Sequence, residues 1–354
     1  MDLQSLSEAK PPLPREPLPI IVVGAGGIVH DAHLPAYRKA GFPVAALVDA
    51  NLGRAQMVAE KYSVPVATTS LDEAIRKSPK GSVYDVAVPA GAILDVLPLL
   101  PDGSAALIQK PMGNTLSEAK QILTLCRKKE LTAAVNFQLR YAPVMLAARH
   151  IADSGQLGEI HDMEIRVNVF TPWDLWTFLA TAPRLEILYH SIHYVDLVRS
   201  WFGNPQQVLA KTVRNPRTAK LAATKSVIVM DYGDSKRVYI ATNHGHRFKD
   251  SQCSYVQWEG MEGALQAVMG VNLDYPKGRP DTLSFAKVDE SWQTLPTEGN
   301  WFPDAFIGSM GSLQAYVSGD AKTLPTSVED AIDTMRAVEA AYISNERDGV
   351  PLNR

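Results

Sequence analysis

Short apolar runs and helix-compatible segments alternate along the first 138 residues. The runs Ile20–Val23 and Val83–Val88 are rich in β-branched residues, which is typical of strands buried on both faces of a parallel sheet. Ser70 stands where a helix would begin, and Gly41 where another would end. The pattern predicts strands at 20–23, 44–48, 64–66, 83–88, 105–108 and 132–136, and helices at 33–40, 54–62, 71–77, 93–100 and 115–129. This order indicates an α/β fold with a parallel sheet.

The pattern changes after residue 138. From His161 to Val169 apolar and polar side chains alternate strictly, so one face of this strand is buried and the other is not. Such alternation is typical of an antiparallel sheet. Further strands are predicted at 208–213, 226–231, 237–242 and 254–258, and helices at 143–154, 186–202 and 327–347. We expect a second domain of α+β type with a large, mostly antiparallel open sheet.

A glycine-rich turn, Gly24-Ala-Gly-Gly-Ile-Val29, follows the first strand directly. Gly24 permits a tight turn, and Gly26 has no Cβ, so that a pyrophosphate can approach the backbone. The helix that follows offers free N–H groups to the phosphates. The second strand ends at Asp49, about where an acid binds the adenosine ribose in a dinucleotide fold.

These features predict a nicotinamide cofactor. The charge of Asp49 favours NAD, because it repels a 2′-phosphate, whereas Arg54 leaves NADP possible. Loops at the carboxyl ends of the strands should form the site. The residues expected to contact the cofactor are Gly24, Gly26, Gly27, Ile28, Val29, Asp49, Ala50, Asn51, Arg54, Pro89, Ala90, Gln109 and Lys110.

Composition excludes several other classes. The net charge is −3 and no basic block is present, so nothing indicates a nucleic-acid partner. Hydrophobic residues make up 46% of the chain, yet no apolar run reaches the length of a membrane span. Cys126 and Cys253 form neither a disulfide framework nor a metal motif. The first 18 residues are proline-rich and indicate a flexible or extended tail rather than a signal peptide. We expect a cytoplasmic protein.

An ordered set of motifs resembles the glucose–fructose oxidoreductase / inositol dehydrogenase / rhizopine-catabolism (Gfo/Idh/MocA) family. The motifs are Gly24–Ile28 with His33-Leu-Pro35, Val48-Asp49, Val88-Pro89, Gln109-Lys110-Pro111, Arg140-Tyr-Ala-Pro143, Gly155-x-x-Gly158 and His193-Tyr-Val-Asp196. The resemblance implies a Rossmann NAD(P)-binding domain at 19–138 and a substrate-binding and dimerisation domain at 139–354, after a tail at 1–18. Family members often form dimers through the open sheet, so a homodimer or homotetramer is expected.

The resemblance also implies site residues. Where the family has Glu-Lys-Pro beside the nicotinamide, this chain has Gln109-Lys110-Pro111; where it has Asp-x-Gly-x-His, this chain keeps His193 but carries Tyr189 at the aspartate position. We predict that His193 is the base and Lys110 the electrostatic partner of the substrate oxygen. Tyr189 can replace the aspartate as a proton relay, or can serve packing alone. His190, beside it, completes the predicted catalytic set.

The loop Thr171–Trp176 suits a sugar, because Trp173 and Trp176 offer apolar faces while Asp174 can bind hydroxyls. Packing in the core or at an interface is the alternative for both tryptophans. The predicted substrate set is Lys110, Arg140, Trp173, Trp176, His190 and His193. Asn243–His246 and Trp301–Asp304 are further candidates for a substrate rim or a dimer contact. His190 and His193 lack an obvious third ligand, so no metal is expected.

Three functions remain open. The first is an NAD(P)-dependent dehydrogenase acting on CH–OH groups of a sugar, polyol or sugar derivative. The second is a redox-neutral enzyme that retains NAD and passes through a transient keto-sugar in elimination, epimerisation or glycoside cleavage. The third is a dinucleotide-sensing regulatory protein. The altered residues Gln109 and Tyr189 are the reason for considering the redox-neutral enzyme. The presence of both Lys110 and His193 argues against the regulatory protein.

Overall fold

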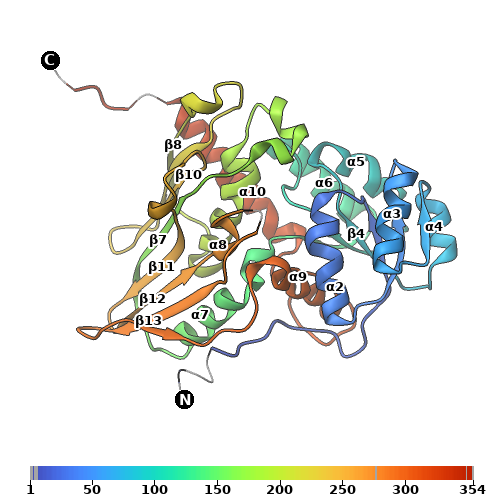
Figure 1. Ribbon diagram of the computed structural model, residues 1–354, viewed down its shortest axis with the longest axis horizontal. Helices are drawn as coiled ribbons and strands as arrows, with labels where there is room; N and C mark the ends of the chain where they lie inside the picture. The colour runs from blue at the N-terminus through green and yellow to red at the C-terminus, as the bar shows by residue number, and fades with distance from the viewer. Residues whose placement is uncertain (1–2, 4–6, 276, 348, 353–354) are drawn as a thin grey trace. The chain divides into compact units, whose positions relative to one another are not determined.

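The structure is a computed structural model that describes residue 3 and residues 7–275, 277–347 and 349–352. Figure 1 shows the ribbon. The chain divides into two compact units. The first unit holds Lys10–Ala142 and Phe302–Met335, and the second holds Met1–Ala9, Pro143–Trp301 and Arg336–Arg354. The expected boundary at residue 138 lies close to the first crossing, but residues 302–335 return to the first unit.

The first unit is built on six parallel strands in the order β3-β2-β1-β4-β5-β6. The strands are β1 (Ile20–Val23), β2 (Val44–Val48), β3 (Val66–Thr68), β4 (Val83–Val86), β5 (Ala105–Ile108) and β6 (Thr132–Val135). β1 is buried along its whole length, as its apolar composition predicts, and β4 is equally buried although it contains Asp85. The strand order reverses between β1 and β4, which is where a doubly wound sheet opens a ligand crevice. The expected α/β fold is confirmed.

Local sequence sets the ends of the helices in this unit. Ser70 Oγ accepts a hydrogen bond from Glu73 N at 3.2 Å, and Gly41 ends α2 with a φ of 70°. The first helix begins earlier than expected, because a π-helical turn precedes α2. The helical segments of 27–142 are η1 (Val29–His33), α2 (Leu34–Ala40), α3 (Leu52–Tyr62), α4 (Leu71–Lys77), η2 (Ala90–Ala92), α5 (Ile93–Val96), η3 (Leu97–Leu99), α6 (Leu116–Lys128) and η4 (Gln138–Tyr141).

The second unit contains an eight-stranded sheet in the order β14-β13-β12-β11-β7-β10-β9-β8. Its strands are β7 (Ile160–Asn168), β8 (Gln207–Val213), β9 (Lys225–Asp231), β10 (Arg237–Asn243), β11 (Cys253–Gly260), β12 (Gly263–Val268), β13 (Thr282–Lys287) and β14 (Gln293–Leu295). All pairs are antiparallel except β7 with β10. The expected open, mostly antiparallel sheet is confirmed, and β12 to β14 extend it beyond the strands predicted.

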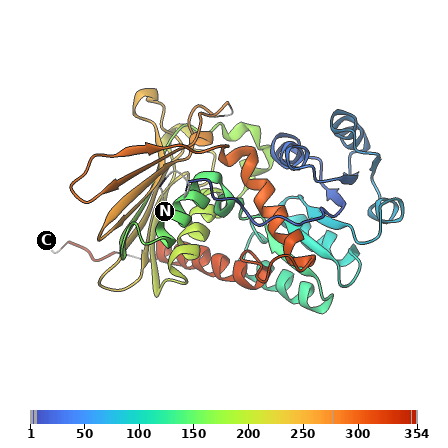
Figure 2. The ribbon, with the colours of Figure 1, turned by 90° about the horizontal axis from the view of Figure 1, so that it is seen from below.

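Helices cover one face of this sheet, as Figure 2 shows for α7 (Pro143–Asp153) and α8 (Ile192–Phe202). Trp258 and Phe285 are fully buried beneath them. The edge strand β8 is protected by α10 (Val328–Glu346), because Ala210 N donates to Ser344 Oγ at 2.9 Å. The remaining turns of this unit are η5 (Trp173–Leu175), η6 (Thr177–Thr181), the π-helical η7 (Ile187–Ser191), η8 (Pro216–Thr218), η9 (Lys249–Ser251) and η10 (Gly270–Asn272).

The proline-rich segment at 10–18 is extended and packed rather than flexible. It runs along α9 (Trp301–Val317): Leu18 N donates to Gln314 Oε1 at 2.8 Å, and Gly311 leaves room for the Leu13 side chain. The tail prediction for residues 1–2 and 4–6 lies outside the described residues. Within the described ranges, every helix is too short or too polar to cross a bilayer.

Candidate functional site

The glycine turn lies at the carboxyl edge of the parallel sheet, between β1 and β4. Gly24 has a φ of 105°, and an added Cβ would lie 2.5 Å from Ala87 O, so only glycine fits this close approach. Gly26 differs, because a Cβ built there would meet no atom within 4 Å among the described residues. The open space in front of Gly26, at the start of a helix, fits a pyrophosphate group. The assignment of this loop to the cofactor stays a prediction, which the open space at Gly26 supports.

Asp49 follows β2 and fixes the glycine turn from the side. Its Oδ2 accepts a hydrogen bond from Ala25 N at 2.7 Å, and its Oδ1 pairs with Arg54 Nη2 at 2.7 Å. Burial raises the pKa of Asp49. Hydrogen bonds from Arg54, Asn51 N and Ala25 N together lower this pKa by more than burial raises it, so the net pKa lies below the usual value. Asp49 is therefore a carboxylate at the edge where the ribose is expected.

A buried polar network lies behind the Gln109-Lys110 segment. Gln109 Oε1 accepts a hydrogen bond from Asn136 Nδ2 at 2.9 Å. Asn136 lies 3.4 Å from His33 Nε2, and His33 Nδ1 pairs with Asp85 Oδ2 at 2.7 Å. Tyr37 adds a hydrogen bond from its hydroxyl to the same Asp85 oxygen at 2.8 Å. These side chains hold the ends of β4, β5 and β6 together, so His33 has a structural role.

Lys110 directly follows β5, at the same edge of the sheet as the glycine turn. Burial lowers the pKa of its ammonium group to about 8, because a charged group loses solvation there. A lysine with such a pKa exists in both protonation states near neutral pH. It can donate a hydrogen bond to an alkoxide and can also exchange a proton.

In the second unit, His193 is the second residue of α8 and is buried, with its ring 5.6 Å from that of Trp301 and nearly perpendicular to it. Tyr189 precedes it in the π-helical turn η7 and packs against an apolar cluster that includes Trp173 and Leu185. This packing supports the structural interpretation of Tyr189. The relay role remains a prediction.

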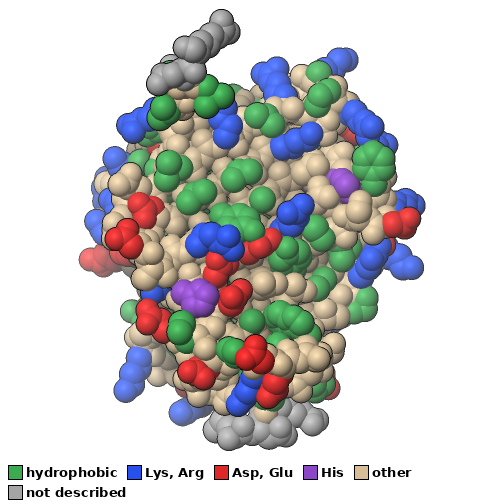
Figure 3. Space-filling view, turned by 90° about the vertical axis from the view of Figure 1, so that its left-hand side faces the viewer, with side chains coloured by type: hydrophobic (Ala, Val, Ile, Leu, Met, Phe, Trp, Pro, Cys, Tyr) green, Lys and Arg blue, Asp and Glu red, His purple; other side chains and the backbone are tan. Residues whose placement is uncertain are grey.

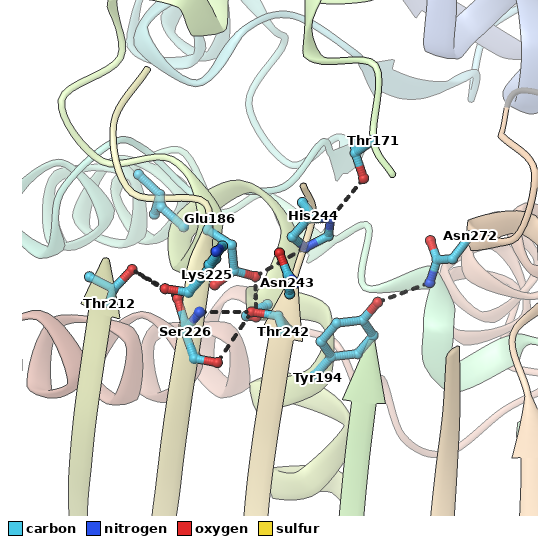
Figure 4. Close-up of polar contacts among 12 residues, drawn as sticks. Thr171, Glu186, Tyr194, Thr212, Lys225, Ser226, Thr242, Asn243, His244 and Asn272 are labelled. Atoms are coloured by element: carbon cyan, nitrogen blue, oxygen red, sulfur yellow. Dashed lines mark hydrogen bonds and ion pairs between the residues drawn. The ribbon is translucent and has the colours of Figure 1, made fainter. Parts of the chain in front are cut away.

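Three side chains converge beside η7 in an arrangement that the sequence did not predict. Glu186, His190 and His244 each offer a ligand atom, and these atoms lie within 4.8 Å of one another. The carboxylate of Glu186 and the ring of His244 are buried, and His190 is half-buried. Figure 4 shows His244 between Thr171 and Glu186, at the end of β10. We call this group the histidine–glutamate cluster.

Hydrogen bonds fix two members of the histidine–glutamate cluster. Thr171 Oγ1 lies 2.8 Å from His244 Nδ1, and Ser191 Oγ donates to Glu186 Oε1 at 2.5 Å. Burial raises the pKa of Glu186, but the neighbouring His244 and the hydroxyl of Ser191 lower it more, and its pKa lies below the usual value. A buried carboxylate is thus held ionised beside two imidazoles.

The aromatic loop at 171–176 lies next to this cluster. The Trp173 ring is buried, 5.3 Å from the His244 ring and 6.3 Å from Trp176. Trp176 is half-buried and also faces Tyr275 at 5.5 Å. Trp173 therefore serves packing, whereas Trp176 remains a candidate for a sugar face.

Arg140, predicted to bind substrate, lies in the first unit and has protein partners. Its Nη2 pairs with Asp330 Oδ2 at 2.7 Å, and its Nη1 donates to Pro325 O at 2.9 Å. These contacts fix the segment before α10. They favour a structural role for Arg140 over the predicted contact with substrate.

Sequence reasoning missed the pairing of Glu186 with His244, because the two are 58 positions apart (244 − 186) and only the fold joins them. The sequence contains only a weak indication of this pairing. His244 belongs to the segment Asn243–His246, which was a candidate for a substrate rim or dimer contact, and Glu186 stands at the start of a predicted helix. His246, in the same segment, points elsewhere and pairs with Ser251 at 2.9 Å.

Comparison with known proteins agrees with the sequence motifs. Residues 18–137 match the family model of oxidoreductases with an NAD-binding Rossmann fold, and residues 145–266 match the GFO/IDH/MocA C-terminal domain. A D-apiose dehydrogenase of Paraburkholderia graminis is 23% identical over 334 residues, covering 88% of this chain and 84% of that protein.

Two solved structures share the fold. An oxidoreductase from Agrobacterium radiobacter, in complex with NAD+, L-tartaric acid and magnesium, has a TM-score of 0.75 at 20% identity and covers 93% of this chain and 96% of its own. An aldose–aldose oxidoreductase from Caulobacter crescentus, complexed with glycerol, has a TM-score of 0.78 at 15% identity and covers 93% and 98%. With both family models matched in order, the chain belongs to the GFO/IDH/MocA family of NAD(P)-dependent oxidoreductases.

Proposed function

We propose that this protein is an NAD-dependent dehydrogenase that transfers a hydride between nicotinamide and a hydroxyl-bearing carbon of a sugar or polyol. The observation that carries the proposal is Lys110 at the carboxyl edge of the sheet that also presents the Gly24–Gly26 turn and Asp49. The names of relatives support the substrate class, since they include a D-apiose dehydrogenase and an aldose–aldose oxidoreductase.

The residues present fit the cofactor. Gly26 leaves open space at the start of a helix, whose N–H groups bind phosphate, and Asp49 presents a carboxylate for the ribose hydroxyls. The nicotinamide, when bound, accepts the hydride. Lys110 holds the substrate oxygen and stabilises the alkoxide that develops there. His193 takes the hydroxyl proton, because an imidazole can act as a general base.

NAD is preferred over NADP in this proposal. The Asp49 carboxylate would repel a 2′-phosphate, and the guanidinium of Arg54 is engaged by Asp49 at 2.7 Å. Arg54 is half-exposed, so it would become available to a phosphate if Asp49 were neutral. The preference for NAD therefore rests on a single carboxylate.

The dehydrogenase and its two alternatives, a redox-neutral enzyme and a regulatory protein, predict different results when NAD and a sugar are added. A dehydrogenase accumulates reduced nicotinamide absorbance when NAD and a sugar substrate are added. A redox-neutral enzyme turns its sugar over without net accumulation, and a regulatory protein binds NAD without turnover. A panel of aldoses and polyols, monitored both by absorbance and by loss of the sugar, separates all three. Loss of sugar without reduced nicotinamide would overturn the proposed dehydrogenase.

We further propose a homodimer or homotetramer formed through the open sheet. Strands β8 and β9 expose a row of apolar side chains on the face opposite the helices: Leu209, Val213, Val227 and Val229. Figure 3 shows this side of the second unit, with hydrophobic side chains among charged ones. Exposed apolar side chains gathered on one sheet face are typical of an interface. We call this row the β8–β9 apolar row.

A cytoplasmic location completes the proposal. Both cysteines are free thiols, with Cys126 buried in α6 and Cys253 half-buried in β11. Thiols of this kind are ordinary in a reducing compartment. Fractionation of cells that express the protein, followed by immunodetection, tests the location directly. Recovery of the protein in an extracellular or periplasmic fraction would contradict it.

A further inference from the structure

The histidine–glutamate cluster has the composition of a metal site. Two imidazoles and one carboxylate form a donor set that proteins use for zinc and for other divalent first-row metals. The donors come from three places in the chain: Glu186 precedes the turn η7, His190 lies within it, and His244 follows β10. All three belong to the second unit, so the cluster is complete within one compact part of the chain.

The distances agree with this use. Zinc binds imidazole nitrogen and carboxylate oxygen at about 2.1 Å, which in a tetrahedral site places two donors about 3.4 Å apart. His244 Nε2 lies 3.4 Å from Glu186 Oε1, and all three donors lie within 4.8 Å of one another. The His190 ring lies 4.1 Å from the His244 ring between centroids, so the third donor belongs to the same group.

Hydrogen bonds to the side chains of His244 and Glu186 also support a metal site. Metal-bound histidines generally donate the hydrogen of the other ring nitrogen to a nearby acceptor, which fixes the tautomer. His244 Nδ1 lies 2.8 Å from Thr171 Oγ1, and with its hydrogen there the lone pair of Nε2 faces Glu186. Ser191 Oγ donates to Glu186 Oε1 and orients the carboxylate. These hydrogen bonds orient both side chains in the way that bound metals generally require of their ligands.

A second observation concerns the remaining oxygen of Glu186. The side chain is 0% exposed, and Oε2 has no hydrogen-bond partner among the described residues. A buried carboxylate oxygen without a partner is costly and requires an explanation, such as an ion. The ion pair between Glu186 and His244 engages Oε1 and leaves Oε2 without a partner, whereas a cation bound by both carboxylate oxygens would engage Oε2 as well.

We propose that Glu186, His190 and His244 bind one zinc-type divalent cation. Three protein ligands leave a fourth position open, and that position takes water or a hydroxyl oxygen. The site lies beside the aromatic loop, because the Trp173 ring is 5.3 Å from the ring of His244. The cation would therefore link η7 to the end of β10 and fix the base of this loop. The proposal does not depend on the proposed dehydrogenase activity.

The test is calorimetric titration of the full-length protein, stripped with a chelator, using zinc chloride alone. We expect one saturable site per chain. Loss of a second-shell partner costs about 10- to 100-fold in affinity, so His244→Asn and Glu186→Gln should each weaken binding more than about a hundredfold. The control is His246→Asn, since this nearby histidine pairs with Ser251 at 2.9 Å and should leave binding unchanged.

Two further measurements cover the case in which a buried variant fails to fold. Thr171→Val removes a half-buried second-shell partner and should weaken zinc binding about 10- to 100-fold. Cobalt(II) bound to the unmodified protein should give the intense visible bands of a four-coordinate site. Absence of saturable zinc binding, equal loss in His246→Asn, or the spectrum of hydrated cobalt alone would overturn the proposal.

Discussion

At the scale of single residues, Lys110 and its neighbour Gln109 should determine how kcat/KM changes with pH. Burial places the pKa of Lys110 at about 8, so the ammonium form predominates below that pH and is lost above it. Since the protonated lysine stabilises the alkoxide, kcat/KM should fall as the pH rises above about 8, a limb that reports the free enzyme. The resemblance to the family implies a glutamate where this chain has Gln109, so the amide here removes a charge next to Lys110.

Gln109→Glu should move this limb to higher pH. A carboxylate adjacent to Lys110 favours the charged lysine and raises its pKa by roughly one unit. Asn136 Nδ2, which donates to Gln109 Oε1 at 2.9 Å, can donate equally to a glutamate, so the packing should survive. The measurement is kcat/KM against pH for the two proteins, with Gln109→Met as a neutral control. An unchanged profile in the glutamate variant would show that residue 109 does not set the pKa of Lys110.

Asp49 should control the choice between the two dinucleotides. Asp49→Ser removes the charge that repels a 2′-phosphate and releases Arg54, now 2.7 Å from that carboxylate, to pair with the phosphate. We expect the ratio of NADP to NAD affinity to rise roughly tenfold, or about 1.4 kcal/mol. The double variant Asp49→Ser with Arg54→Ala should lose most of that gain. Equal ratios in the wild type and Asp49→Ser, measured by calorimetry, would contradict this role.

At the scale of elements, the capping of α6 matters because this helix directly follows the Lys110 loop. Thr115 Oγ1 accepts a hydrogen bond from Glu118 N at 3.1 Å, and Glu118 Oε2 accepts one from Asn114 N at 2.8 Å. Thr115→Ala should therefore lower the free energy of unfolding by about 1 kcal/mol, while Thr115→Ser should retain most of it. Denaturant unfolding of the three proteins measures this. Equal stability of the alanine variant would mean that the cap contributes nothing.

Sequence patterns predicted elements well where periodicity was strong. The alternation at 161–169 identified β7, and the N-cap at Ser70 identified α4. Strands β12, β13 and β14 were missed because each is short and offers few alternating positions, and α9 was missed because Pro303 near its start reads as a loop signal. The π-helical turns η1 and η7 have no simple sequence signature.

At the scale of the whole molecule, the site could be predicted only in part. The cofactor loops lie at strand ends, so topology alone brings the glycine turn, Asp49 and Lys110 to one edge. The histidine–glutamate cluster depends on a long-range pairing of β10 with the turn before α8, which no local pattern specifies. Arg140 was assigned to substrate from a motif, whereas its partner Asp330 lies 190 residues away.

The proposed assembly is a whole-molecule property that the β8–β9 apolar row should control. Val227 is 50% and Leu209 54% exposed, so a charge at either position should not disturb the core. Leu209→Asp with Val227→Asp should convert the oligomer to a monomer in analytical ultracentrifugation, because a buried interface does not tolerate unpaired charges. Met57→Asp, on the exposed face of α3 in the first unit, is the control. An unchanged mass for the double variant would place the interface elsewhere.

The central claim is that Lys110 acts in hydride transfer to NAD. The most direct test is rapid mixing of the NAD-loaded protein with a substrate found in the sugar and polyol panel, following reduced nicotinamide in a single turnover. We expect prompt formation in the wild type, and a rate at least about a hundredfold lower in Lys110→Ala, with NAD affinity nearly unchanged. Equal rates in the two proteins, or no reduced nicotinamide in the wild type with any sugar or polyol, would contradict the account.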